Sequence, residues 1–131
     1  MAAERYPPDD PREWLNRARS SLIQAQMLQP GVYVEDLCFN AQQAAEKAIK
    51  ALLIRRGVAF PYIHDLTELL RLLQDAGERI PDVVRQSGQL SRFAVFTRYP
   101  GVARPVSQEE YQDALALAEQ VVQWVEERLR P

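Results

Sequence analysis

The sequence contains one cysteine and one histidine in 131 residues. A single cysteine, Cys38, excludes a disulfide within the chain and any metal site built from cysteines. Because Cys38 falls on the apolar face of a predicted helix, we expect a buried structural thiol rather than a nucleophile. The single histidine, His64, excludes a histidine-only metal site and a two-histidine acid–base pair within one chain. We therefore expect neither a metal nor another cofactor.

Long apolar runs and a large excess of one charge are also missing. No stretch approaches the roughly 20 apolar residues of a transmembrane helix, and the N-terminal residues MAAERYPPDD lack the hydrophobic core of a signal peptide. We therefore expect a cytoplasmic protein without a membrane partner. The formal net charge of −2 gives no general basic field of the kind that dominates affinity for nucleic acids, although local basic clusters can still bind phosphate.

What the chain does contain is apolar spacing at the helical period, with only five glycines. This pattern predicts an all-α, up-and-down helical bundle of four main helices plus one shorter helix. Residues 1–9 are predicted to form a flexible N-terminal arm, and residues 10–131 a single helical domain. We expect five helices, at residues 10 to about 28, 33 or 34 to 57, 65 to 77, 81 or 82 to about 96, and 107 to 129. Residues 10, 65 and 107 are the predicted N-caps, and the glycines at 57 and 77 are the predicted stops.

Local signals mark the ends and faces of these helices. Gly88 weakens the middle of the fourth helix, where we expect a bend or a break. In the last helix, Leu117 and Trp124 lie off the main apolar stripe and are candidates for a second buried surface, such as a subunit contact. Three helix starts carry a capping residue followed three positions later by a glutamate: Asp10 with Glu13, Asp65 with Glu68, and Ser107 with Glu110.

The second helix has an alanine-rich apolar face beside a polar stripe with one-turn spacing, formed by Gln42, Gln43, Glu46, Lys47 and Lys50. One interpretation is a solvated face on which Glu46 and Lys50 form a favourable i,i+4 pair, and periodicity alone favours it. The other interpretation is that Gln43, Lys47 and Lys50 line a groove for phosphate or for the acidic surface of a partner.

Two short segments leave a similar choice open. His64 either hydrogen-bonds the start of the third helix while Asp65 caps it, or faces a cleft with an arginine from elsewhere. Arg98-Tyr99-Pro100 either ends the fourth helix or binds a phosphate and stacks a base. No serine or threonine has a base nearby to form a triad, and no glycine-rich phosphate loop is present.

Three motifs together resemble the small prokaryotic HEPN domain (higher eukaryotes and prokaryotes nucleotide-binding). In order along the chain, they are FNAQQAAEKAIKALLIRRG, PYIHDLTELL and TRYP. The resemblance extends from about residue 14 to 129. It implies an all-α bundle, usually homodimeric and often encoded beside a minimal nucleotidyltransferase in a toxin–antitoxin-like system. It also implies a nucleotide- or partner-binding site, formed here by Gln42, Gln43, Glu46, Lys47, Lys50, His64, Asp65, Arg98 and Tyr99.

One departure from the family concerns catalysis. HEPN members that cut RNA resemble each other in an arginine followed, four to six residues later, by a histidine. Here Arg55 and Arg56 precede His64 with eight and seven residues between, and no histidine follows Arg92 or Arg98. We therefore expect a non-catalytic subunit that binds nucleotide or RNA, or docks a nucleotidyltransferase. The alternative is a metal-independent endoribonuclease with His64 as acid–base and Arg98 on the phosphate.

Overall fold

The computed structural model describes residues 4–95, 100–101 and 104–131. Within these ranges the chain forms five α-helices and one 3-10 helix and contains no strand, so the predicted all-α bundle is confirmed. None of these helices is both long and apolar enough to cross a membrane. The elements are α1 (Pro11–Ala25), α2 (Val34–Arg55), α3 (Leu66–Asp75), α4 (Asp82–Arg85), the 3-10 helix η1 (Gln86–Ala94) and α5 (Gln108–Leu129).

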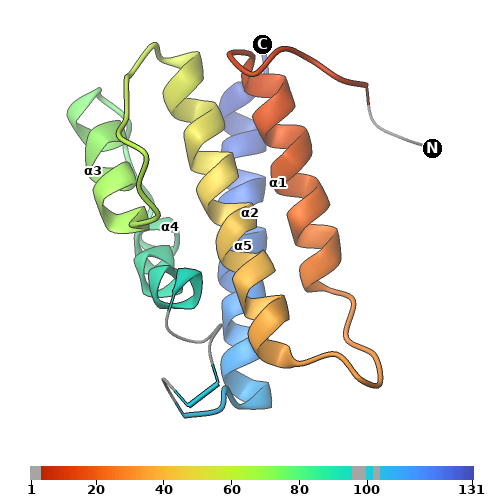
Figure 1. Ribbon diagram of the computed structural model, residues 1–131. Coiled ribbons are helices and arrows are strands. Elements are labelled where there is room, and N and C mark those ends of the chain that lie inside the picture. Colours follow the sequence, from red (N-terminus) through yellow and green to blue (C-terminus); the bar gives the residue numbers. More distant parts are fainter. Residues whose placement is uncertain (1–3, 96–99, 102–103) are drawn as a thin grey trace.

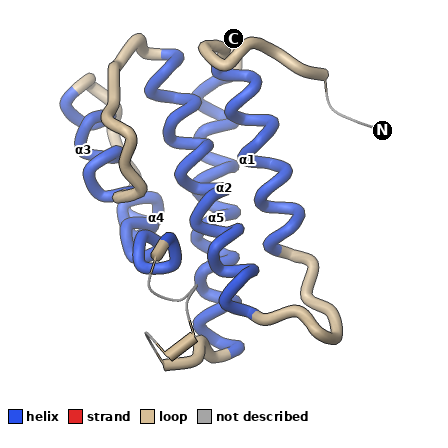
Figure 2. Tube along the Cα trace, viewed as in Figure 1, coloured by secondary structure: helices blue, strands red, loops and turns tan. Residues whose placement is uncertain are grey.

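The three longest helices, α1, α2 and α5, pack together, while α3 and η1 cover one side of α2 and α4 packs against α5 (Figure 1). The hydroxyl of Tyr111, near the start of α5, donates to the carbonyl of Ala25 at the end of α1, at 2.6 Å. At the other end of the bundle, Arg55 of α2 donates to the carbonyl of Leu129 of α5 at 3.4 Å. Helix α1 is therefore antiparallel to both α2 and α5. The α1–α2 loop lies at one end of the bundle, whereas the 58–64 loop runs back along the side of α2 to the start of α3 (Figure 2).

Small side chains allow α2 to lie at the centre of the bundle. Its alanines 41, 44, 45, 48 and 51 are fully buried, which lets neighbouring helices approach closely. Cys38 is buried on the same helix, as expected, and burial raises the pKa of its thiol to about 12. The thiol is therefore a packing group, because the reactive thiolate is disfavoured.

One predicted helix end is wrong, and one predicted helix changes type along its length, while its predicted end near residue 96 lies outside the described residues. Helix α1 ends at Ala25 rather than near residue 28, because residues 26–33 must turn the chain so that α2 can pack antiparallel. The fourth predicted helix is α-helical only as far as Arg85 and then continues as a 3-10 helix. A Cβ atom on Gly88 would lie 2.3 Å from Thr67 Oγ1, so the missing side chain allows η1 to pack directly on α3. The predicted weak point at Gly88 thus marks a close contact between two segments.

All three predicted capping residues cap their helices, but only one of the predicted capping boxes is complete. Ser107 and Glu110 make the complete reciprocal capping box at the start of α5. Asp65 caps α3 by accepting from the backbone N–H of Thr67 at 3.0 Å. The predicted box at this helix is wrong, because the Glu68 side chain binds Arg71 instead. Asp10 caps α1, whereas the third residue of that helix, Glu13, accepts from the backbone of the preceding segment.

Candidate functional site

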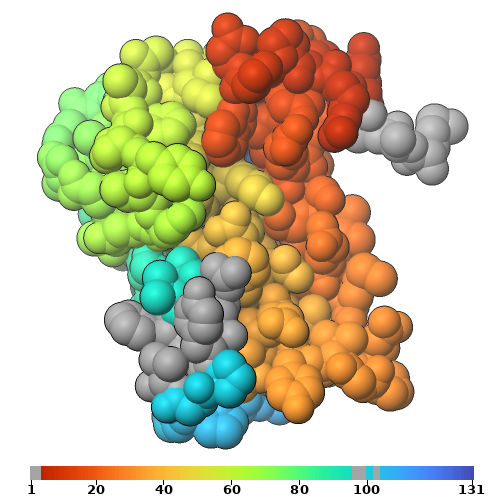
Figure 3. Space-filling model, viewed as in Figure 1, coloured from red at the N-terminus to blue at the C-terminus, as the bar shows by residue number. Residues whose placement is uncertain are grey.

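A cavity of about 370 Å³ lies where the N-terminal segment and α1 face the 58–64 loop across α2. The space-filling view shows this hollow between the red and green parts of the surface (Figure 3). Four separate segments therefore build the site. Its lining residues are Tyr6, Pro8, Glu13, Trp14, Arg17, Gln43, Glu46, Lys47, Lys50, Tyr62 and His64.

Three members of the polar stripe on α2 are buried, so its interpretation as a solvated face is wrong for them. Gln42 has no exposed surface, Glu46 is 4% exposed and Lys50 is 2% exposed. The periodicity of α2 could not reveal this burial, because the groups that cover the stripe come from α1 and from the segment that leads into α3. The expected i,i+4 pair does form, with Lys50 Nζ 3.0 Å from Glu46 Oε2.

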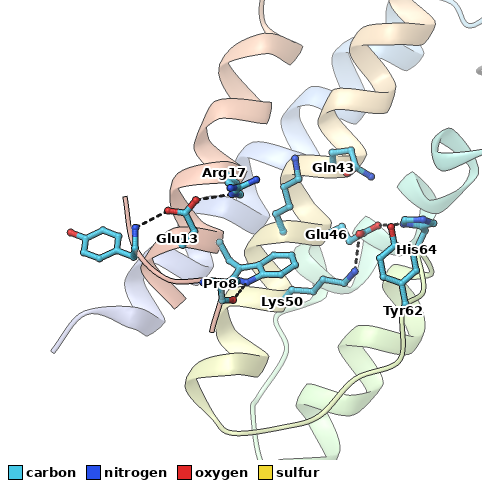
Figure 4. Close-up of a pocket in the computed structure, with 11 residues that line it drawn as sticks. Pro8, Glu13, Arg17, Gln43, Glu46, Lys50, Tyr62 and His64 are labelled. Carbon is cyan, nitrogen blue, oxygen red and sulfur yellow. Dashed lines mark hydrogen bonds and ion pairs between the residues drawn. The ribbon is translucent and has the colours of Figure 1, made fainter. Parts of the chain in front are cut away.

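Glu46 holds the polar groups of this cavity together (Figure 4). One carboxylate oxygen accepts from Gln42 Nε2 and lies 2.9 Å from His64 Nδ1, while the other accepts from Lys50. Burial acts to raise the pKa of Glu46, but these three hydrogen bonds outweigh burial and hold the pKa below its ordinary value. Glu46 is therefore a buried anion that fixes a lysine and an imidazole.

Aromatic rings surround the ammonium group of Lys50. Its Nζ lies 5.5 Å from the ring centres of Phe60 and Tyr62 and 5.9 Å from that of Trp14. These distances are within the range of cation–π attraction, so the rings and Glu46 together compensate the buried charge. Tyr62 is 90% exposed and stands edge-on to the imidazole of His64, with ring centres 5.6 Å apart. An open aromatic wall thus borders the cavity.

A second lysine of α2, Lys47, has a different environment. Its Nζ donates to Ser21 Oγ at 2.9 Å and forms no ion pair with a carboxylate in the described part of the chain. Burial lowers the pKa of Lys47, and the nearby guanidinium of Arg17 lowers it further. Arg17 itself pairs with the buried carboxylate of Glu13 at 2.7 Å. Besides Lys50, which is paired with Glu46, the cavity therefore holds two neighbouring cations, Arg17 and Lys47, and Lys47 has no counter-ion among the described residues.

The structure brings five predicted site residues to one cavity: Gln43, Glu46, Lys47, Lys50 and His64. The interpretation in which the His64 side chain hydrogen-bonds the start of α3 is wrong, because its Nδ1 lies against Glu46 instead. Asp65 is outside the cavity lining and serves as the cap. Arg98 and Tyr99 lie outside the described residues. No group of three or more His, Cys, Asp or Glu side chains in the described ranges is arranged to hold a metal ion.

The N-terminal segment and α1 form the other side of the cavity, and none of their residues is among the predicted site residues. The Trp14 Nε1–H donates to the carbonyl of Pro8 at 2.6 Å, and the Tyr6 backbone N–H donates to Glu13 at 3.0 Å, so residues 6–8 lie along α1 (Figure 4). In the sequence, Trp14 has the spacing of a core residue and Arg17 that of a surface partner for Glu13. Their approach to Lys47 and Lys50 depends on the pairing of α1 with α2, which no local pattern specifies.

Comparison with known proteins agrees with this architecture. The crystal structure of TT1696 from Thermus thermophilus matches with a TM-score of 0.80 and 35% identity, covering 91% of this chain and 98% of that chain. The crystal structure of ST0689, an archaeal HEPN homologue, matches with a TM-score of 0.74 and 26% identity, covering 92% of this chain and 98% of that chain. Among curated proteins, none matches this chain.

The family comparison covers most of the chain. The model of the HEPN domain matches residues 11–128, a span that includes nearly all of every helix of the structure. A match of this extent supports a function related to nucleotides or RNA in general terms. The resemblance carried by the three sequence motifs is thereby confirmed. The chain belongs to the HEPN domain family.

Proposed function

We propose that this chain is a non-catalytic nucleotide- or RNA-binding subunit of HEPN type whose ligand occupies the cavity between α1, α2 and the 58–64 loop. The observation that carries the proposal is the environment of Lys47. Its ammonium group shares the cavity with Arg17 and has no ion-pair partner among the described carboxylates. Two adjacent cations that have only one carboxylate counter-ion favour the binding of an anionic ligand.

A phosphate group satisfies both cations. Lysine and arginine each form charge-assisted hydrogen bonds with phosphate oxygens, and such bonds contribute roughly 1.5–3 kcal/mol each. The repulsion from Arg17 that helps to lower the pKa of Lys47 would also be offset by the negative charge. The phosphate subsite of the proposal is therefore formed by Arg17 and Lys47.

The opposite side of the same cavity fits a nucleobase. Trp14 and Tyr62 contribute aromatic surface to the lining, and the Tyr62 ring is almost entirely open to solvent. Bases stack on such rings with little dependence on sequence. Gln43 also lines the cavity, and its amide oxygen can accept a hydrogen bond from a base. An aromatic wall beside a cationic wall is the arrangement that a nucleotide requires.

The arrangement of the buried charges favours a site that binds its ligand without catalysis. Glu46 already accepts from Gln42 and Lys50 and contacts His64, so its role is to fix these groups. The arginine–histidine spacing of ribonucleolytic HEPN proteins is also missing from the sequence. One observation favours a second candidate, the metal-independent endoribonuclease: a carboxylate that orients an imidazole is also how acid–base catalysts are held. In that alternative Arg98 would bind the phosphate.

On the family resemblance, we also propose a homodimer and a docking partner, a minimal nucleotidyltransferase encoded nearby in a two-component, toxin–antitoxin-like system. Exposed apolar side chains near the α1–α2 connection, including Ile23, Met27 and Tyr33, offer surface for such contacts. Sedimentation analysis of the purified chain tests the homodimer, since a monomer mass would contradict it. Co-purification with a nucleotidyltransferase from the neighbouring open reading frame tests the docking.

Calorimetric titration with AMP and ATP tests the nucleotide site. Replacing Lys47 by glutamine removes the charge that has no counter-ion, and we expect the affinity to fall about tenfold or more, since one charge-assisted bond to phosphate is lost. The matched control is Arg85→Gln, which removes one positive charge from an exposed position that contacts Gln74 outside the cavity. Equal affinities for the wild type and both variants would contradict the proposed site.

Incubation with single-stranded RNA separates the two candidates. The proposal predicts that the wild-type chain leaves the RNA intact. Cleavage by the wild type that is lost on replacing His64 by alanine would overturn the non-catalytic assignment in favour of the endoribonuclease. Retained nucleotide binding in the same variant would show that the loss is not caused by unfolding.

A further inference from the structure

A second cavity of about 520 Å³ lies beside the first, along α1 where this helix borders Lys47 of α2. The two cavities share Arg17 and Lys47 in their linings, so these cations stand at the junction between them. Each cavity is within the range of roughly 300–1,000 Å³ that is common for small-molecule sites. The second one is lined by Glu4, Arg5, Asn16, Arg17, Ser20, Ser21, Gln24 and Lys47.

The second cavity differs from the first in its chemistry. None of its lining residues is aromatic; instead it presents amides and hydroxyls together with three cations and one carboxylate. The Arg5 side chain is 79% exposed, and its nearest carboxylate oxygen, on Glu13, is 3.9 Å away. In the described part of the chain, the Gln24 amide hydrogen-bonds Ser20, the residue one turn before it, at 3.3 Å. These side chains leave donors and acceptors open toward an added ligand.

We infer that this second cavity is a further ligand subsite and that the chain holds a single-stranded oligonucleotide of at least two units rather than a mononucleotide. The bridging phosphate lies at Arg17 and Lys47, one base occupies the aromatic cavity, and the next sugar and base extend over Ser20 and Gln24. This inference rests on the proposed function, since it starts from a nucleotide in the first cavity.

Charge and polarity support this extension. Lys50 is paired with Glu46, and Arg17 and Arg5 share Glu13, so Lys47 is the lining cation that has no ion pair among the described residues, and it lies on the border of the two cavities. A negatively charged group bound to Lys47 would therefore lie at the junction of the two cavities. Beyond it, hydroxyl and amide side chains suit the hydroxyls of a sugar, which donate and accept in the same way. A mononucleotide would leave this polar cavity empty.

The test compares ligands that carry the same single negative charge. The probes are adenylyl-3′,5′-adenosine and the methyl phosphates of adenosine at its 3′ and 5′ positions, each titrated calorimetrically into the full chain. We expect the dinucleotide to bind about tenfold more tightly than either methyl ester, since the second unit adds contacts of about 1.4 kcal/mol in total. The variant Ser20→Leu fills the polar cavity and should reduce the affinity for the dinucleotide to that of the methyl esters while leaving methyl-ester binding unchanged.

A matched control is Gln112→Leu, an equally apolar change at an exposed position of α5, which should alter no affinity. If the methyl esters bind in a Lys47-dependent manner but the dinucleotide binds no more tightly, the second subsite is overturned and the proposed function stands. If neither the methyl esters nor the dinucleotide bind, both are overturned. A dinucleotide preference that Ser20→Leu leaves unchanged would also contradict the location of the subsite.

Discussion

At the scale of single residues, Glu46 connects the charged groups of the cavity to the core of the bundle. Its carboxylate is almost fully buried and contacts an amide, an ammonium group and an imidazole. Lys50 is buried with it and has aromatic rings on its other side. Buried ion pairs contribute little net stability over apolar packing, but removing one partner leaves the other charge buried and uncompensated.

Replacing Glu46 by glutamine should therefore destabilise the fold. We expect a loss of about 3 kcal/mol in the free energy of unfolding at pH 7, because the ammonium group of Lys50 is left without a counter-charge. Urea denaturation followed by circular dichroism measures the change. The control is Glu68→Gln, which removes an exposed carboxylate paired with Arg71 and should change stability little. Equal stability of the Glu46→Gln variant and the wild type would contradict the buried pair.

The pH dependence of this difference follows from the pKa of Glu46. Hydrogen bonds hold that pKa below its ordinary value of 4.5 in the folded chain, so the unfolded chain takes up the proton first as the pH falls. The stability contributed by the charged carboxylate is present above about pH 4.5 and is lost as the pH falls through the folded pKa. The difference in the free energy of unfolding between the wild type and Glu46→Gln should therefore become smaller as the pH is lowered. A difference that stays constant from pH 7 to pH 3 would show that charge is not its cause.

At the scale of elements, α2 determines the site because neighbouring faces of one helix serve two purposes. Its alanine face sets the distance to α1 and α5, and its polar stripe then lies at the opening between α1 and the 58–64 loop. The change from α4 to η1 depends on a similarly close approach, in which Gly88 faces Thr67. In both cases a small side chain on one element lets another come close enough to position polar groups.

The variant Gly88→Ala tests this approach. The new methyl group would meet the hydroxyl of Thr67, which has to rotate away, and we expect a loss of about 1 kcal/mol in unfolding free energy. With Thr67 also replaced by alanine, the same change should become stabilising by about 0.5 kcal/mol, because alanine restricts the unfolded chain. A double-mutant cycle by thermal or urea denaturation measures the coupling. Additive effects would contradict a direct contact between η1 and α3.

At the scale of the whole molecule, the sequence predicted what depends on local periodicity and capping. The all-α bundle, the extent of α2 and the caps at Asp10, Asp65 and Ser107 follow from apolar spacing and from side chains that satisfy free backbone groups. Helix ends depend on packing as well as on local sequence. Helix α1 stops at Ala25 so that the chain can return along it, which its own composition does not indicate.

The candidate site could be predicted only on its α2 and His64 side. Gln43, Glu46, Lys47 and Lys50 share a helical stripe, and the family motifs pointed to them and to His64. The residues from Tyr6 to Arg17 reach the cavity through pairing of α1 with α2, and long-range partners leave no local signal. Outside the cavity, the ion pairs of Glu78 also depend on long-range partners that no local pattern indicates. Its buried carboxylate pairs with Arg56 just after α2 and with Arg128 of α5, at 2.9 Å in each case.

The most direct test of the central claim is a crystal structure of the chain with AMP or a dinucleotide bound. The account predicts a phosphate oxygen within hydrogen-bond distance of Lys47 Nζ and of the Arg17 guanidinium, with a base against Tyr62 or Trp14 and an intact ligand. A nucleotide bound at another surface, with Lys47 still bonded only to Ser21, would contradict it.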